Sequence, residues 1–444
     1  MKRRACGVSW RAVFCAALGW SAAGRADPAA METAAMETAG AWQVKVTCGG
    51  RVAVLAVDPP DIITVTDEAY ERLALFQGPE WRRGTPLLGP KAEACSVAGA
   101  LDPASLVVRD GPGAAAKVFA RGKDYQLEPR WAGFGRLEGG AIAADRPVYA
   151  SYRYAMMRLD SVVQKADGPL AVRKGVPHVA VPRPPEIGEG ETRVGNVWLA
   201  GRVDRLAGDH LFPILECAYP EPARQGASVA EQRLPKTLAK LRAGRPVRIL
   251  AWGDSVTECV YLPFQQKWQE QFAVRLRARF PKASIVMLSE GWGGRTTTAF
   301  RQEPPGSLHN YAENVLALKP DLIVSEFIND AYMNEAAVLE NYGAILKDFQ
   351  RIGAEWIILT PHYARPDWMG LAREREIDLD PRPYVRGLRL FAENNRVALA
   401  DASLRWGRLW RQGLPYSTLL VNAINHPDER GMALFADALM ALFP

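Results

Sequence analysis

This sequence has little histidine and cysteine, almost no excess of charge beyond its N-terminus, and no long apolar run after it. It contains 5 His and 6 Cys among 444 residues. Cys48, Cys95, Cys217 and Cys259 follow the first 26 residues and form neither a CxxC pair nor a Cys/His cluster. This spacing is not that of a structural zinc site, so we expect no metal and no cofactor. A Cys48–Cys95 disulfide and four separate thiols both remain open.

Charge is nearly balanced outside the N-terminal segment. The chain carries 55 Lys and Arg against 49 Asp and Glu, which gives a net charge of +6. Five of the basic residues lie in residues 1–26, which contain no acidic residue. A nucleic-acid-binding surface needs a basic stripe on the folded domain, so we predict no nucleic-acid partner.

Residues 1–26 have the pattern of a secretory signal peptide. A basic start, Met1–Arg11, precedes a short apolar run over residues 12–20 and then small residues before Asp27. The run is shorter than the ~20 residues that cross a bilayer. We therefore expect a secreted or periplasmic protein with a cleaved leader and no transmembrane segment, and an uncleaved anchor is the alternative.

The rest of the sequence divides into a linker, a β-rich half and an α/β half. Residues 27–41 contain a tandem METAA/METAG repeat and are expected to be a flexible linker. In residues 42–200, short runs of period-two alternation between turn residues predict a β-rich accessory domain, most clearly at Val148–Tyr154. Residues 201–244 are expected to connect the halves. In residues 245–444 strands alternate with helices, which predicts a parallel sheet covered on both faces.

The elements expected in the second half follow one another regularly. Strands are predicted at Val247–Trp252, Ser284–Leu288, Asp321–Phe327, Glu355–Thr360 and Arg396–Ala400. Helices are predicted at Phe264–Phe280, Ser307–Leu318, Glu335–Ile352, interrupted within Leu371–Asn394, and Glu429–Leu442. Ligands of such sheets bind beyond the C-terminal ends of the strands, so functional residues should follow the strands.

Two residues there have the chemistry of nucleophilic catalysis. Ser255 follows the first strand in the run Gly253-Asp254-Ser255, where a tight turn before a helix would expose its hydroxyl. Asp254 is expected to orient this turn. His426 precedes the final helix and is placed to be a general base, because so few histidines compete with it.

Two further stations could bind a developing negative charge. A Gly-rich run after the second strand includes Gly294, and Asn329 follows the third strand. Glycine lets a backbone N–H approach a ligand closely, and the Asn amide is a donor. Arg295 could meet an acidic sugar or pair with a carboxylate.

In this order, the four motifs resemble those of the SGNH (GDSL-type) hydrolases, over about residues 245–444. The second block is also somewhat like that of rhamnogalacturonan acetylesterases. The resemblance implies a flavodoxin-like three-layer α/β/α fold and a serine ester hydrolase. It implies Ser255 as nucleophile, His426 as base, and an oxyanion hole formed by Ser255, Gly294 and Asn329.

The sequence departs from the family at two positions. The family usually has Asp three residues before the histidine, and this chain has Ala423. Asn422, Asn425, Asp428 or a backbone carbonyl could substitute, so we expect a Ser-His dyad with the third member unassigned. The third block has Phe327 where the family usually has Gly, which could narrow the pocket or move the loop.

Two classes of function follow. The favoured one is a secreted serine esterase that hydrolyses ester groups, expected to be O-acetyl groups on carbohydrate, through an acyl-enzyme. An O-acyltransferase with the same residues and a lipase or lysophospholipase are alternatives within the enzyme class. The other class is a non-catalytic glycan-binding protein. The oligomeric state is left open.

Overall fold

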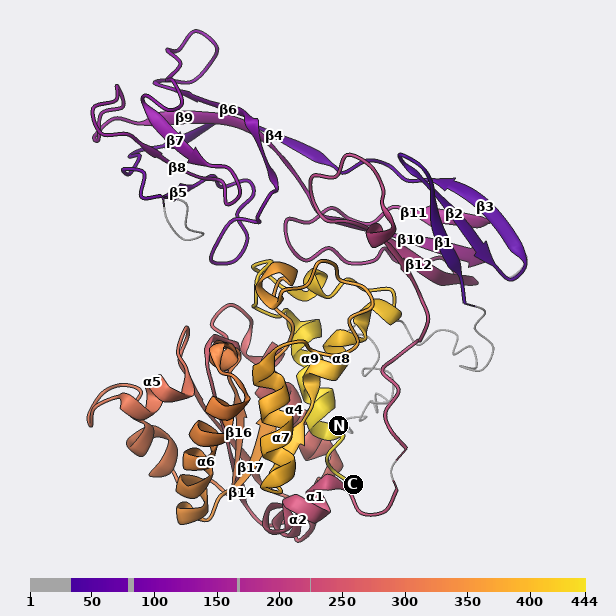
Figure 1. The fold of residues 1–444 in the computed structure, drawn as a ribbon, viewed down its shortest axis with the longest axis vertical. Helices are drawn as coiled ribbons and strands as arrows, with labels where there is room; N and C mark the ends of the chain where they lie inside the picture. Colours follow the sequence, from indigo (N-terminus) through magenta and orange to yellow (C-terminus); the bar gives the residue numbers. More distant parts are fainter. Residues whose placement is uncertain (1–32, 79–83, 166–167, 224) are drawn as a thin grey trace, which may run out of the picture.

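The computed structural model describes residues 33–78, 84–165, 168–223 and 225–444. The expected signal peptide, residues 1–26, lies outside the described residues. Figure 1 shows the β-rich half, coloured indigo to magenta, above an α/β domain coloured mainly orange to yellow. Within the described part, none of the helices combines the length and the apolar character needed to cross a membrane.

The α/β domain is built on a five-stranded parallel sheet with the order β15-β14-β16-β17-β18. Its strands are β14 (Val247–Gly253), β15 (Ile285–Gly291), β16 (Leu322–Glu326), β17 (Glu355–Leu359) and β18 (Ala398–Ala400). Numbered along the chain, this order is 2-1-3-4-5, which is the flavodoxin-like arrangement. In that arrangement ligands bind where the strand order reverses, between β14 and β16.

Helices cover both faces of the sheet, as predicted. They are α1 (Val229–Arg233), α2 (Pro235–Arg242), α3 (Ser255–Glu258), α4 (Trp268–Arg279), α5 (Thr297–Gln302), α6 (Glu335–Ile352), α7 (Pro383–Asn394), α8 (Ala402–Gly407) and α9 (Glu429–Met440). Ile249 and Ala251 of β14 lie in a core shared with α4 and α9. Leu250 and Trp252 lie in a second core, shared with α6 and α7. This alternation confirms the three-layer α/β/α fold.

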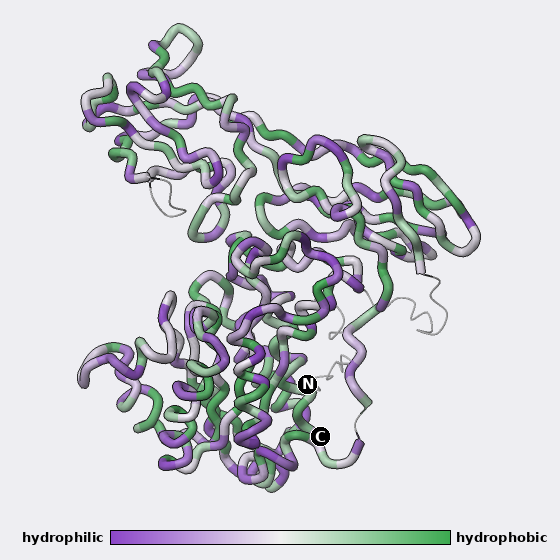
Figure 2. Tube along the Cα trace, in the orientation of Figure 1, coloured by the Kyte–Doolittle hydropathy of each residue, from purple (hydrophilic) through white to green (hydrophobic). Residues whose placement is uncertain are grey.

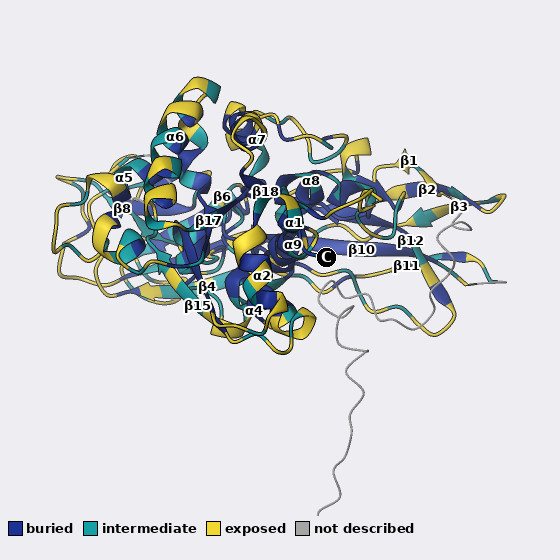
Figure 3. Ribbon diagram, turned by 90° about the horizontal axis from the view of Figure 1, so that it is seen from below, coloured by how far each residue is buried: buried dark blue, intermediate teal, exposed yellow. Residues whose placement is uncertain are grey.

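Hydropathy and burial follow the same layers. Figure 2 shows hydrophobic stretches through the interior of the α/β domain, and Figure 3 shows buried residues at its centre with exposed ones on the outer side of α6. Helix α6 begins after the Asn334 cap, whose side chain accepts a hydrogen bond from the Ala337 N–H. It ends at Gly353, where φ is 78°. Its bounds agree with the sequence prediction.

The predicted helix Phe264–Phe280 begins only at Trp268. The predicted helices Ser307–Leu318 and Leu371–Asn394 are shortened further. Only Ala312–Leu316 of the first forms a helical segment, and it is a π turn. In the second, the helix begins only at Pro383, because proline fits the first helical position but not the interior.

The β-rich half consists of two lobes, each with its own core. The first lobe (residues 34–57 and 158–213) contains β1 (Ala35–Gly40), β2 (Gln43–Cys48), β3 (Arg51–Ala56), β10 (Arg158–Lys165), β11 (Leu170–Arg173), β12 (Glu191–Leu199) and β13 (Leu211–Pro213). The inserted lobe (residues 62–155) contains β4 (Ile62–Tyr70), β5 (Thr85–Pro86), β6 (Leu101–Arg109), β7 (Tyr125–Glu128), β8 (Gly133–Arg136) and β9 (Val148–Ala155). Figure 1 shows them side by side. The inserted lobe interrupts the first lobe between β3 and β10.

Two boundary expectations need correction. The expected linker, residues 27–41, contains β1, which pairs antiparallel with β2 because Ala34 and Met36 join the hydrophobic core beneath. The expected connecting segment, residues 201–244, contains β13, which pairs with β12. It also contains α1 and α2, which join the core of the α/β domain.

Candidate active site

Ser255 lies in the tight turn between β14 and α3. Gly253 ends the strand, and a Cβ atom there would lie 2.1 Å from the Thr257 hydroxyl oxygen, so only glycine fits. Asp254 caps α3, because its Oδ1 accepts a hydrogen bond from the Val256 N–H at 3.1 Å. The turn places Ser255 at the C-terminal edge of the sheet, where the sequence predicts it.

The structure brings His426 to Ser255. Nε2 of the imidazole lies 3.1 Å from Ser255 Oγ. The ring stacks on Tyr261 with the ring centroids 4.4 Å apart and an interplanar angle of 3°. His426 is buried, with a side-chain exposure of 10%. At this distance an imidazole nitrogen can take the hydroxyl proton.

The turn that carries His426 is organised by Asn422. Its Oδ1 accepts hydrogen bonds from the backbone N–H groups of Ile424, Asn425 and His426 at 2.9, 2.8 and 3.0 Å. Ala423 adopts a left-handed conformation with φ of 54°. The side chain of Asn422 therefore holds the backbone of this turn, and it does not replace the missing acid.

The other two candidates for the third member are also engaged elsewhere. The backbone carbonyl of Asn425 lies 2.7 Å from His362 Nε2. Asp428 caps α9 by accepting from the N–H groups of Arg430 and Gly431, and it accepts from the Arg430 side chain at 2.7 Å. Asn425 Oδ1 accepts a hydrogen bond from Asn422 Nδ2 at 3.1 Å, and Asp428 is used by the cap of α9, so neither of these two open alternatives contacts the His426 ring.

A residue that the sequence analysis missed faces the second imidazole nitrogen. Glu93 Oε2 of the inserted lobe lies 2.6 Å from His426 Nδ1, across a sequence separation of 333 residues. No motif surrounds Glu93. The sequence gives only an indirect indication. Because Ala423 occupies the position of the family's acid, a carboxylate that orients His426 would have to belong to another segment of the chain.

The loop that carries Glu93 spans residues 87–100, between β5 and β6. At its tip the Ala92 N–H donates to the Cys95 carbonyl at 2.8 Å, and Ala94 has a φ of 61°. Val97 and Ala100 join the hydrophobic core that also contains α9. The loop thus packs into the α/β domain.

The cysteine at this tip is not part of a disulfide with Cys48. Cys95 Sγ lies 3.5 Å from the backbone carbonyl of Asn422, as a hydrogen-bond donor. Cys48 lies in β2, and its Sγ is 3.3 Å from Gln164 Oε1. The two thiols have different partners, so of the two alternatives the structure contains separate thiols.

Asn329 presents an unused donor near the nucleophile turn. Its Nδ2 is buried and has no hydrogen-bond acceptor within the part of the chain that the structure describes. Its backbone N–H donates to Asp254 Oδ2 at 2.9 Å, which joins the ends of β14 and β16. A buried donor without a partner is costly, so this amide marks a place where a ligand oxygen would be stabilised.

The Gly-rich loop after β15 lies against α3. A Cβ atom at Gly291 would lie 2.2 Å from the Glu258 backbone nitrogen, so a side chain has no room there. The Gly293 N–H donates to Glu258 Oε2 at 2.8 Å. Gly294 follows with φ of 74°, which favours glycine. The loop can therefore bring the Gly294 backbone close to a ligand at Ser255.

Arg295 and Phe327, both singled out from the sequence, pack against aromatic rings. The Arg295 guanidinium lies over the ring of Trp292, 4.7 Å from its centroid, and the side chain is exposed. Phe327 is buried and packs edge-on against Trp252, with ring centroids 4.8 Å apart. Phe327 therefore fills the core beneath the sheet edge.

Residues 251–434 match the model of the GDSL-like Lipase/Acylhydrolase family. The C-terminal domain belongs to this family. The family resemblance noted in the sequence is thereby confirmed for this domain, and so is the ester hydrolase class at the level of the family. None of the curated proteins searched matches the chain.

Several solved structures resemble a part of the chain weakly. A two-domain esterase (CEX) active on acetylated mannans is 16% identical, with 47% of this chain and 51% of that chain covered and a TM-score of 0.37. The match thus spans about half of that esterase. A variant of Axe2, an acetyl xylan esterase from Geobacillus stearothermophilus, is 19% identical, with 44% and 93% covered and a TM-score of 0.35. The fold assignment rests on the sheet order and the family match, because TM-scores this low do not establish it.

Beneath the site of the GDSL-like domain lies a buried cluster of three carboxyl groups. Burial raises the pKa of Asp254 to about 7, against the opposing hydrogen bonds from backbone N–H groups. Burial and the neighbouring Asp254 raise the pKa of Glu326 well above its usual value. Burial raises the pKa of Asp330 to about 6, although Thr297 and Tyr342 donate to it. The cluster joins the ends of β14 and β16, and Asp254 thereby positions Asn329.

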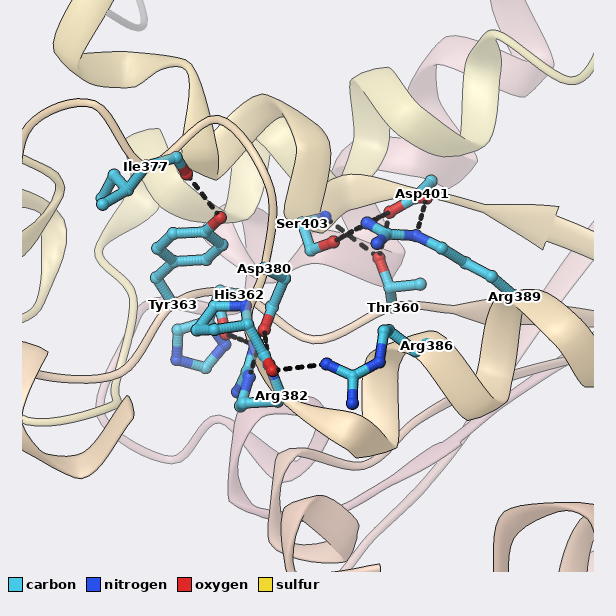
Figure 4. Close-up of polar contacts among 11 residues, drawn as sticks. Thr360, His362, Tyr363, Ile377, Asp380, Arg382, Arg386, Arg389, Asp401 and Ser403 are labelled. Carbon is cyan, nitrogen blue, oxygen red and sulfur yellow. Dashed lines mark hydrogen bonds and ion pairs between the residues drawn. The ribbon is translucent and has the colours of Figure 1, made fainter. Parts of the chain in front are cut away.

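A second polar network supports the turn of His426 from behind. Figure 4 shows Arg382 beside Asp380 and His362, and Arg382 Nη2 donates to the His362 carbonyl at 2.7 Å. Burial and the nearby Arg382 hold the pKa of His362 well below its usual value, so its ring is neutral. Because the Asn425 carbonyl can only accept, His362 Nε2 carries the proton between them. The network links the end of β17 to the turn that holds the base candidate.

Proposed function

We propose that the protein is an exported serine esterase that hydrolyses O-acetyl esters of carbohydrate through an acyl-enzyme. One observation carries the hydrolase chemistry: a serine hydroxyl 3.1 Å from a buried imidazole, at the switch point of a parallel sheet, beside a buried amide donor without a protein acceptor among the described residues. These are the parts that an acyl transfer needs: a nucleophile, a base and a preorganised oxyanion donor.

The reaction would proceed in two steps. Ser255 Oγ attacks the acetyl carbonyl carbon while His426 Nε2 takes the hydroxyl proton. The negative charge that forms on the carbonyl oxygen is stabilised by Asn329 Nδ2 and by the backbone N–H groups of Ser255 and Gly294. His426 then gives its proton to the departing sugar oxygen, and the acyl-enzyme remains. His426 then deprotonates a water molecule that attacks the acyl carbon, and it returns this proton to Ser255 Oγ as the bond between Oγ and the acyl group breaks and acetate leaves.

Support for a carbohydrate comes from export and from aromatic side chains near the strand ends. Residues 1–26 have the pattern of an export signal, and an exported enzyme would meet polysaccharides. Tyr332 and Trp368 follow β16 and β17 and are 67% and 48% exposed. Exposed rings of this kind offer flat apolar faces with a polar edge, which suits stacking on sugar rings.

The test is hydrolysis of p-nitrophenyl acetate and of acetylated xylan by the mature protein. Ser255→Ala and His426→Ala should each lower kcat by at least about 10³-fold, because each removes a member of a cooperating unit. His210→Ala, outside the GDSL-like domain, is the matched control and should retain activity. Wild-type activity no higher than that of Ser255→Ala on every short ester would contradict the esterase proposal.

Covalent labelling separates an enzyme from a binding protein. A fluorophosphonate should label the wild-type protein and leave Ser255→Ala unlabelled, because only an activated serine reacts. Adding a sugar acceptor to the acetyl ester assay separates hydrolysis from acyl transfer. If acetylated sugar forms in place of acetate, the acyltransferase alternative holds.

A further inference from the structure

We propose that Glu93 completes a Ser255–His426–Glu93 triad, so that the inserted lobe is part of the active site of the GDSL-like domain. This inference rests on the proposed esterase function. Glu93 touches the base and not the substrate, so it is a positioning residue. It replaces the acid that the family carries three residues before its histidine, where this chain has Ala423.

The geometry around the imidazole defines the role of Glu93. Its Oε2 lies 2.6 Å from Nδ1, while Nε2 lies 3.1 Å from Ser255 Oγ. A carboxylate can only accept, so Nδ1 carries the proton and Nε2 keeps its lone pair for the serine. When His426 takes the serine proton, the carboxylate stabilises the positive charge on the ring.

The loop tip is held by the same turn that carries His426. The Glu93 N–H donates to the Val421 carbonyl at 3.4 Å, and Cys95 Sγ donates to the Asn422 carbonyl at 3.5 Å. Carboxylate and imidazole are thus positioned against one stretch of backbone. The left-handed Ala94, with φ of 61°, lets the loop reverse at this point.

A second contact fixes the inserted lobe on the α/β domain. Trp131 of the inserted lobe lies under the Arg365 guanidinium, 4.8 Å from the ring centroid. Asp367 forms ion pairs with Arg130 of the inserted lobe and with Arg365. The Arg365 N–H donates to the Ile424 carbonyl at 2.7 Å, within the turn of His426. The loop tip and the Trp131 contact therefore both lie against the turn that carries His426.

The kinetic experiment compares Glu93→Gln with Glu138→Gln, an exposed glutamate on the same lobe. With p-nitrophenyl acetate, Glu93→Gln should lower kcat by about 10²- to 10⁴-fold and leave KM unchanged, because the base is misoriented and the substrate contacts remain. Glu138→Gln should match the wild type in both. Glu93→Gln activity within about twofold of the wild type, in a protein that loses activity with Ser255→Ala, would overturn the triad and leave the esterase proposal intact.

A second measurement needs no folded Glu93 variant and no activity. In wild-type protein labelled with ¹⁵N-histidine, NMR should show a proton on Nδ1 of His426, and this proton should resonate far downfield because of the short bond to a carboxylate. The signal is assigned by its loss in His426→Ala and should persist in Ser255→Ala. A proton on Nε2 of neutral His426 would overturn the role of Glu93, whether or not the protein hydrolyses esters.

Discussion

Two regions of the molecule meet at the candidate site, and they hold their polar groups in opposite ways. The strand ends of the α/β domain bury Asp254 and the Nδ2 atom of Asn329, with glycines where a Cβ atom has no room. The inserted lobe contributes one carboxylate, Glu93, from a loop tip with a side-chain exposure of 30%. The strand ends constrain each residue locally, whereas the loop constrains Glu93 only through the docking of the whole lobe.

Because of this difference, substitutions at the strand ends and substitutions at the contact between lobe and domain should have different effects. Removal of the Asn329 amide at a strand end takes one donor from a rigid site and should alter catalysis alone. A change where the lobe docks should leave the chemistry of the α/β domain intact and should alter how often Glu93 is in place. Three substitutions, taken from the largest expected effect to the smallest, test this contrast.

Asn329→Ala removes the buried amide donor of the α/β domain. We expect kcat to fall by about 10²- to 10³-fold, because one oxyanion donor is lost. The stability should change little, since Nδ2 has no partner among the described residues. Steady-state kinetics with p-nitrophenyl acetate check this, with the exposed Asn394→Ala as control. A kcat equal to that of the control would remove Asn329 from the oxyanion hole.

Trp131→Ala weakens the docking of the inserted lobe. Its ring lies under the Arg365 guanidinium of the α/β domain, with the guanidinium carbon 4.8 Å from the ring centroid. Loss of this contact should weaken docking by about 1–2 kcal/mol. In urea, activity should therefore disappear at a lower concentration than the circular dichroism signal of the folded sheet. Val118→Ala, exposed on the same lobe, is the control. If activity and the circular dichroism signal of Trp131→Ala are lost at the same urea concentration, docking of the inserted lobe does not determine when activity is lost.

Glu326→Gln tests the buried carboxyl cluster at the strand ends. The Glu93 loop of the inserted lobe has no such cluster. Burial and Asp254 raise the pKa of Glu326, so above pH 4.5 the folded state keeps a proton that the unfolded state releases. The free energy of unfolding should then fall as pH rises, by at most about 1.4 kcal/mol per pH unit from this group. Glutamine has no such proton, so urea unfolding between pH 5 and pH 7 should show a flatter slope for the variant. Equal slopes would mean that Glu326 is ionised in the folded protein.

The sequence predicts most of the α/β domain because its constraints are local. Apolar strand segments that alternate with helical segments predict the five parallel strands, and the bounds of α6 are predicted as well. Ser255, Asn329 and His426 each follow an expected element, and the structure brings Ser255 and His426 together. The family resemblance adds the roles, which remain predictions until kinetics test them.

The rest could not be predicted because it depends on contacts between distant segments. Residues 35–40 have no hydrophobic alternation of their own and become a strand only by pairing with β2. The division of the β-rich half into two lobes depends on which strands pair, which short runs do not reveal. Glu93 has an ordinary surface sequence around it, and its function exists only when the loop meets the turn of His426.

The 333-residue separation between Glu93 and His426 also has a consequence in time. Contacts between such distant segments close a very long loop of chain, so they form late when a protein folds. The nucleophile turn and the sheet can assemble early from neighbouring segments. During refolding, tryptophan fluorescence should therefore recover before ester hydrolysis does. Recovery of full hydrolytic activity would indicate that the contact between Glu93 and His426 has formed.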